Sequence, residues 1–139
     1  MSSEVLQAAA LIYLLMIAAF FLHKIRPLHV AIMGGAMLFD LLVPFYLYMH
    51  RDWYGQLVTH EGGADFILWC HWALLMTLYI LYALQAKSGV ALAKVAAADD
   101  KNSLALRAEH HLQARGVLLV RLFVILTGWA VFDPQFVLR

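Results

Sequence analysis

RGVLLVRLFVILTG, residues 115–128, has the composition of a membrane-spanning helix, yet Arg121 stands near its middle. A charge at the centre of a bilayer costs at least about 2.5 kcal/mol, so such residues face the interior of a helix bundle and take partners. The stretch therefore predicts a membrane protein in which a second polar residue lies at the depth of Arg121.

The composition of the whole chain agrees with that prediction. The 139 residues are 64% hydrophobic and 14% charged, and the mean hydropathy is +0.77, far too apolar for a soluble domain of this size. Four stretches approach the ~20 apolar residues that cross a bilayer. They are residues 5–22, 29–50, 65–84 and 111–132. We expect an all-α integral membrane four-helix bundle, built as one transmembrane domain over residues 1–139.

The connections between these stretches predict how the chain is oriented. We expect residues 85–110 to form a cytoplasmic connection, whose alanine-rich and lysine-rich sequence could also extend the third helix, turn, and lead amphipathically into the fourth. Basic residues gather in the first and third connections, which places these on the cytoplasmic side and both termini outside. The basic residues are Lys24, Arg26, Lys87, Lys94, Lys101, Arg107 and Arg115, against Arg51 and Arg139 on the opposite side.

Several functional classes are disfavoured by what the chain carries. The formal net charge is +1, and the orientation rule already accounts for the basic residues, so we expect no nucleic-acid partner. Cys70 is the single cysteine, so an intrachain disulfide and a Cys-x-x-Cys motif are both excluded. We find no nucleophile–base pair, phosphate loop or carboxylate pair, and expect a protein that is not an enzyme.

Asp40 is the natural partner for Arg121. It lies 11 residues after His29, and Arg121 lies 11 residues after His110, on two helices that run in the same direction. At about 1.5 Å per residue, both charges share a depth of roughly 16 Å. We therefore predict a structural Asp40–Arg121 ion pair. The alternatives are that Arg121 snorkels, faces a partner subunit, or pairs with a bound anionic group such as a haem propionate.

Seven histidines in so apolar a chain lie at two depths. Near the cytoplasmic side are His23, His29, His110 and His111; near the outer side are His50, His60 and His71. At about 100° per residue, His29 and Asp40 share one face of the second predicted helix, with His50 close to it, and His110 shares a face of the fourth with Arg121. We expect these two polar faces to look at each other.

Four of the histidines are candidate ligands for copper or haem, because neutral imidazole binds copper, iron and zinc. They are His29, His50, His71 and His110. His71 stands out because it lies roughly 9 Å inside the third helix, where a histidine predicts function. His23 and His60 are interpreted as hydrogen-bonding residues at headgroup level. Met33 and Met37 could add soft ligands for Cu(I), but packing is the favoured interpretation of both.

Two arrangements of these histidines compete. A haem b electron carrier would pair His50 with His71 on the outer side and His29 with His110 on the inner side. However, the 21 residues from His29 to His50 span about 31 Å, a wide gap for direct electron transfer. A metal carrier or assembly factor needs only one open site, and the spacing favours this second arrangement.

Four segments give the chain a family resemblance. RPLHVAIMGGAMLF, YLYMHR, FILWCHWALLMTLYILYALQ and HHLQARGVLLVRLFVILTGWAVF follow one another over residues 26–132. In this order they resemble the YozB/CtaM-like four-helix membrane family, small proteins associated with haem-copper oxidase assembly. The resemblance rests on the ordered set His29, His50, His71 and His110, and on the interval from His110 to Thr127-Gly128.

This resemblance implies a function and its partners. It implies an integral membrane protein, in the bacterial inner membrane, that binds copper or haem through the four histidines and works with other membrane subunits such as a haem-copper oxidase. The chain departs from the family in its longer 85–110 segment, in Asp40 and Arg121, and in His111 where arginine is expected. The alternatives are a haem b electron-transfer protein and a structural accessory subunit of a larger membrane complex.

Overall fold

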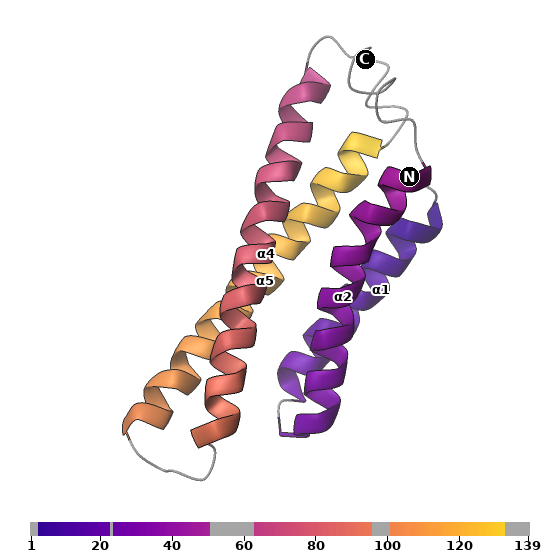
Figure 1. Ribbon diagram of the computed structural model, residues 1–139. Helices are drawn as coiled ribbons and strands as arrows, with labels where there is room; N and C mark the ends of the chain where they lie inside the picture. Colours follow the sequence, from indigo (N-terminus) through magenta and orange to yellow (C-terminus); the bar gives the residue numbers. More distant parts are fainter. Residues whose placement is uncertain (1–2, 23, 51–62, 96–100, 133–139) are drawn as a thin grey trace.

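Four helices make up the part of the chain that the structure, a computed structural model, describes: residues 3–22, 24–50, 63–95 and 101–132 (Figure 1). They are α1 (Ser3–Phe21), α2 (Arg26–His50), α4 (Gly63–Val95) and α5 (Lys101–Phe132). Each is long and apolar enough to cross a membrane, and no strand occurs in those ranges. The predicted fold class is confirmed: the chain is an all-α, four-helix integral membrane protein.

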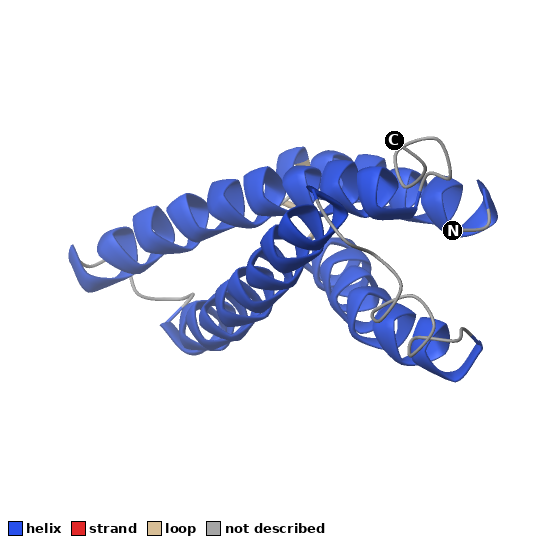
Figure 2. Ribbon diagram, turned by 90° about the horizontal axis from the view of Figure 1, so that it is seen from above, coloured by secondary structure: helices blue, strands red, loops and turns tan. Residues whose placement is uncertain are grey.

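The helices are arranged as two adjacent pairs. α4 packs along α5, and α1 contacts both α2 and α5. The start of α1, the end of α2, the start of α4 and the end of α5 all lie at one end of the bundle, at the top of Figure 1. Seen from above, the helices fan out from a common region instead of running parallel (Figure 2). The bundle is therefore tight near its middle and more open away from it.

The packed core is small and draws on every helix. Met16 and Ala19 of α1, Met33 and Ala36 of α2, Leu78 and Tyr82 of α4, and Val117 of α5 form one buried cluster. Much of the exterior is apolar; Trp69, for example, is 73% exposed. Apolar side chains on this scale cover a surface only where that surface meets lipid or another apolar partner.

α4 and α5 extend well beyond the predicted spans. α4 continues past residue 84 to Val95, and α5 begins at Lys101 instead of residue 111, so most of the predicted 85–110 connection is helical. The reason is that this segment is rich in alanine and also carries leucine and lysine, which are strong helix formers whatever their polarity. At 1.5 Å per residue the 33 residues of α4 span roughly 50 Å, more than the ~30 Å hydrocarbon core.

Some sequence predictions fall on residues outside the described ranges. His23, His60, Arg51 and Arg139 are among them. The assignment of both termini to the outer side of the membrane stays a prediction.

Candidate functional site

An ion pair lies at the centre of the bundle. Arg121 Nη2 of α5 donates to Asp40 Oδ1 of α2 across 2.8 Å, and the Arg121 residue is only 1% exposed. This is the pair that the equal depth of the two residues predicts. A buried pair of this kind is weak evidence for net stability, but loss of one partner leaves an uncompensated buried charge.

Two tyrosines of α4 complete the polar network around Asp40. The Tyr82 hydroxyl donates to Asp40 Oδ2 across 2.5 Å, so both carboxylate oxygens have partners. The Tyr79 hydroxyl donates to the backbone carbonyl of Asp40 across 3.0 Å. That carbonyl needs a donor because Pro44, four residues further along α2, has no N–H to offer it. The network therefore joins α2 to α4 as well as to α5.

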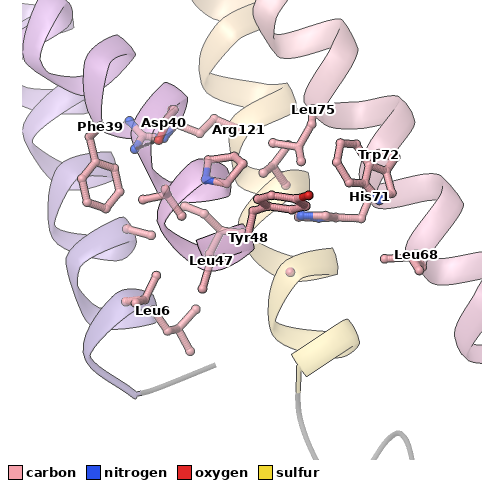
Figure 3. A pocket seen from close by; sticks show the side chains of 17 residues that line it. Leu6, Phe39, Asp40, Leu47, Tyr48, Leu68, His71, Trp72, Leu75 and Arg121 are labelled. Carbon is pink, nitrogen blue, oxygen red and sulfur yellow. Dashed lines mark hydrogen bonds and ion pairs between the residues drawn. The ribbon is translucent and has the colours of Figure 1, made fainter. Parts of the chain in front are cut away.

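A cavity opens beside this network, toward the end of the bundle where α1 begins. Its volume is about 330 Å³, within the range of small-molecule sites. Apolar side chains from all four helices form its walls, among them Leu6, Phe39, Leu75 and Val124. The polar residues lining it include Asp40, Arg121 and His71, and Figure 3 shows the Asp40–Arg121 pair and His71 at separate places around the space.

His71 is held against α5 by two neighbouring residues. Its Nδ1 lies 2.9 Å from Thr127 Oγ1. Because the Thr127 hydroxyl donates to the carbonyl of Phe123, 2.7 Å away, we assign Oγ1 as the acceptor of this contact and place the ring proton on His71 Nδ1. The ring lies over Gly128, where a Cβ would approach Cε1 to 3.2 Å. The absence of a side chain at Gly128 therefore makes room for the imidazole.

This arrangement gives His71 the properties of a ligand. With Nδ1 protonated, Nε2 of the neutral ring bears a lone pair, and the Val124 carbonyl, which also lies within hydrogen-bond reach of the ring, is an acceptor that cannot engage that lone pair. The imidazole extends from α4 into the cavity beside Tyr48 (Figure 3). A histidine whose second nitrogen is fixed by a hydrogen bond is the usual form of a metal-ligating imidazole.

A second polar cluster joins α4 and α5 nearer the other end of the bundle. Ser88 Oγ lies 2.8 Å from both His110 Nδ1 and Gln113 Oε1, and Gln85 Nε2 lies 3.1 Å from His110 Nε2. Gln85 is 3% exposed and its Oε1 has no partner among the described residues. Both ring nitrogens of His110 are thus engaged by α4. The cluster explains why the two helices stay paired beyond the predicted spans.

The structure brings together one of the two predicted histidine pairs. The rings of His29 and His110 have centroids 6.4 Å apart, although His29 Nδ1 is bound to the Ala19 carbonyl across 2.9 Å. His50 is exposed, stacks on Tyr46 at 4.4 Å, and bonds to the Tyr46 carbonyl. No contact between described residues joins His50 to His71.

The donors expected for copper are not gathered in one place. Within the described ranges, no group of three or more histidine, cysteine, aspartate and glutamate residues could hold a metal ion. Met33 is buried in the core and Met37 packs against it, as the packing interpretation predicts. A copper site made of all four candidate histidines does not fit this arrangement, whereas a group that needs a single imidazole does fit at His71.

Sequence reasoning missed four residues of this site: Tyr79, Tyr82, Pro44 and Thr127 as the partner of His71. Pro44 offered a usable signal, because a proline four residues after Asp40 frees the Asp40 carbonyl. The tyrosines are one helical turn apart, which also puts them on one face. Comparison with protein-family models, curated proteins and solved structures gives no match for this chain. Fold and site define a four-helix integral membrane protein with an apolar cavity lined by one histidine and an ion pair.

Proposed function

We propose that this protein binds haem within the membrane, with His71 as the axial ligand. The observation that carries the proposal is the state of the His71 ring. Thr127 fixes its proton on Nδ1, which leaves the Nε2 lone pair for a Lewis acid at an apolar cavity. A neutral imidazole of this kind is the common proximal ligand of haem iron.

The surroundings of His71 favour a metalloporphyrin over a ligand that only accepts hydrogen bonds and over a bare copper ion. A ligand that accepts hydrogen bonds, such as a carbonyl compound, gains nothing from an unprotonated nitrogen. A bare copper ion needs several donors. The described residues form no group of three or more histidine, cysteine, aspartate or glutamate side chains that could hold one. A large apolar ring carrying a metal satisfies both the Nε2 lone pair and the apolar walls of the cavity.

The proposal favours a carrier over a permanent electron-transfer centre. Among the described residues that line the cavity, His71 is the one histidine, so these residues supply one axial ligand instead of two. A haem held through the His71 imidazole alone would keep a coordination position for a ligand from an acceptor protein. We therefore propose a transient haem carrier that acts during assembly of a haem-copper oxidase, as the resemblance implies, in the bacterial inner membrane.

The test is an absorption titration of the purified protein with haem b in detergent. We expect the wild-type protein to give a saturable Soret band at one haem per chain, and His71→Ala to lose it. His50→Ala is the matched control, because His50 is exposed and contacts Tyr46, and it should bind as the wild type does.

Two results would contradict the proposal. One is a Soret band that His71→Ala leaves unchanged, since the haem then sits elsewhere or in the micelle. The other is a colourless preparation that binds copper stoichiometrically and takes up no haem, which would favour the copper alternative.

A further inference from the structure

We infer that the His71 cavity is filled from the bilayer, through a lateral mouth between α2 and α4 whose edges are Tyr48 and Trp72. This inference rests on the proposed function and adds to it the route by which haem enters and leaves. Its basis is which of the described cavity-lining residues are exposed.

Two exposed aromatic side chains mark the mouth of the cavity. Tyr48 of α2 is 66% exposed and Trp72 of α4 is 39% exposed, whereas the other described residues of the lining are buried or half-buried. A side chain that lines a cavity and also meets the surroundings stands where the cavity opens. The mouth therefore lies between α2 and α4, and Figure 3 shows both aromatic rings near the His71 imidazole.

The packing of the helices leaves this side of the bundle open. α4 packs along α5, and α1 packs against α2 and α5, but α2 and α4 approach each other at few places. The hydrogen bonds of Tyr79 and Tyr82 join the two helices at Asp40. Tyr48 lies eight residues after Asp40, about 12 Å further along α2. The bonds at Asp40 therefore close the inner end of the seam, and the mouth lies beyond them.

The surface around the mouth is suited to lipid. Phe45, one helical turn from Tyr48, and Met76, one turn from Trp72, are also exposed. Apolar side chains in such a position meet the hydrocarbon of a bilayer instead of water. A ligand that reaches the mouth on this side therefore comes from the lipid phase.

The mouth lies near the edge of the hydrocarbon core. α2 ends at His50, two residues after Tyr48. Tyrosine and tryptophan are enriched at this level of a bilayer, because their rings are apolar while the hydroxyl and the indole N–H reach water. Headgroups and water are thus within reach of whatever part of a ligand stays in the mouth.

This position suits the amphipathic character of haem b, which has one apolar edge and one edge that carries both propionates. A ring that enters with its apolar edge first leaves both carboxylates at headgroup level, where they stay hydrated. The apolar cavity then does not have to bury an anion, which would be costly without a partner. Entry from the side therefore reconciles the apolar lining with an acidic ligand.

The experiment closes the mouth with a covalent link. In a Cys70→Ser background, Tyr48→Cys and Trp72→Cys are joined by a bismaleimide. The matched control is the same variant treated with N-ethylmaleimide, which modifies both cysteines without joining them. A second pair, Phe45→Cys with Met76→Cys, flanks the mouth outside the cavity lining, and it repeats the test should the first pair weaken haem binding itself.

Haem b is supplied before or after the link is made, with the protein in lipid nanodiscs. In protein linked first, we expect uptake of haem from lipid vesicles, followed by the Soret band, to be about tenfold or more slower than in the control. In protein loaded first, release of haem to apomyoglobin should slow by a similar factor, because a closed mouth retains the ligand as well as excluding it.

The two rates together identify a passage, since damage to the His71 site would speed release. Uptake that the link leaves unchanged, or release that is unchanged or faster, overturns the inference while haem binding stands. If the wild-type protein and the unlinked variants bind no haem through His71, the proposed function fails, and this inference with it.

Discussion

At the scale of single residues, the site depends on how His71 is seated. Thr127 sets the proton on Nδ1, and Gly128 lets the ring lie close to α5. Neither residue has to touch a ligand for this to matter, because the direction of a ligating lone pair follows the ring that bears it. Thr127 and Gly128 of α5 therefore determine in which direction His71 of α4 can bind a ligand.

Gly128→Ala should weaken haem binding about tenfold, since its Cβ would stand 3.2 Å from His71 Cε1 and the ring would have to move aside. The measurement is the dissociation constant from an absorption titration. Gly116→Ala is the matched control, because its Cβ would meet Leu81 Cδ1 at an ordinary 3.8 Å, and affinity should stay unchanged. Equal affinities in the two variants would contradict the claim that Gly128 makes room for the His71 ring.

The sequence allowed the Asp40–Arg121 pair to be predicted, but not the contacts that position the His71 ring. The rise per residue is fixed, so equal distances from two helix starts imply equal depth whatever the packing. The contacts of His71 with Thr127 and Gly128 depend instead on the rotation and crossing of α4 and α5. The rotation and crossing angle of the two helices result from the packing of many side chains and cannot be read from any short stretch of the sequence.

At the scale of the elements, Pro44 joins α2 to α4. A proline inside a helix breaks one backbone hydrogen bond, and here the Tyr79 hydroxyl takes over at the freed Asp40 carbonyl. Prolines are tolerated in membrane helices where a neighbour satisfies the backbone group in this way. α2 and α4 lie close to each other at few places. The hydrogen bonds of Tyr79 and Tyr82 to Asp40 are therefore the main polar links between the described parts of these two helices.

Tyr79→Phe should therefore lower the free energy of unfolding by about 1–3 kcal/mol, the cost of leaving a buried carbonyl without a donor. In a Pro44→Ala background the alanine N–H can bond to the Asp40 carbonyl, and the same substitution should cost far less. Unfolding by SDS in mixed micelles measures all four proteins of this cycle. An equal cost of Tyr79→Phe in both backgrounds would show that the hydroxyl does not replace the missing helix bond.

The ends of α4 and α5 show where hydropathy alone falls short. A fall in apolar content after residue 84 marks the edge of the membrane-spanning stretch, not the end of the helix. Gln85 and Ser88 are polar, yet they are buried and bound to His110 and Gln113 across the helix pair. The existence of these helices could be predicted from composition, whereas their ends depend on this polar cluster.

At the scale of the whole molecule, four antiparallel spans place the start of α1 and the end of α5 on one side (Figure 1). The distribution of lysine and arginine predicts that this side faces outward. Alkaline phosphatase fused after residue 139 should be active in intact cells, and green fluorescent protein fused there should stay dark. Fusions at residue 98 should give the reverse pattern. Fluorescence from the C-terminal fusion would mean that the predicted orientation is wrong.

The central ion pair also bears on how the chain enters the bilayer. Asp40 and Arg121 are 81 positions apart, so at about 5–20 residues per second the ribosome needs roughly 4–16 s after making Asp40 to deliver its counter-charge. During that interval α2 carries a carboxylate that hydrocarbon rejects. We therefore expect α2 to settle in the bilayer only when α5 arrives, because a chain truncated before α5 lacks Arg121, the cation that pairs with Asp40 in the bundle.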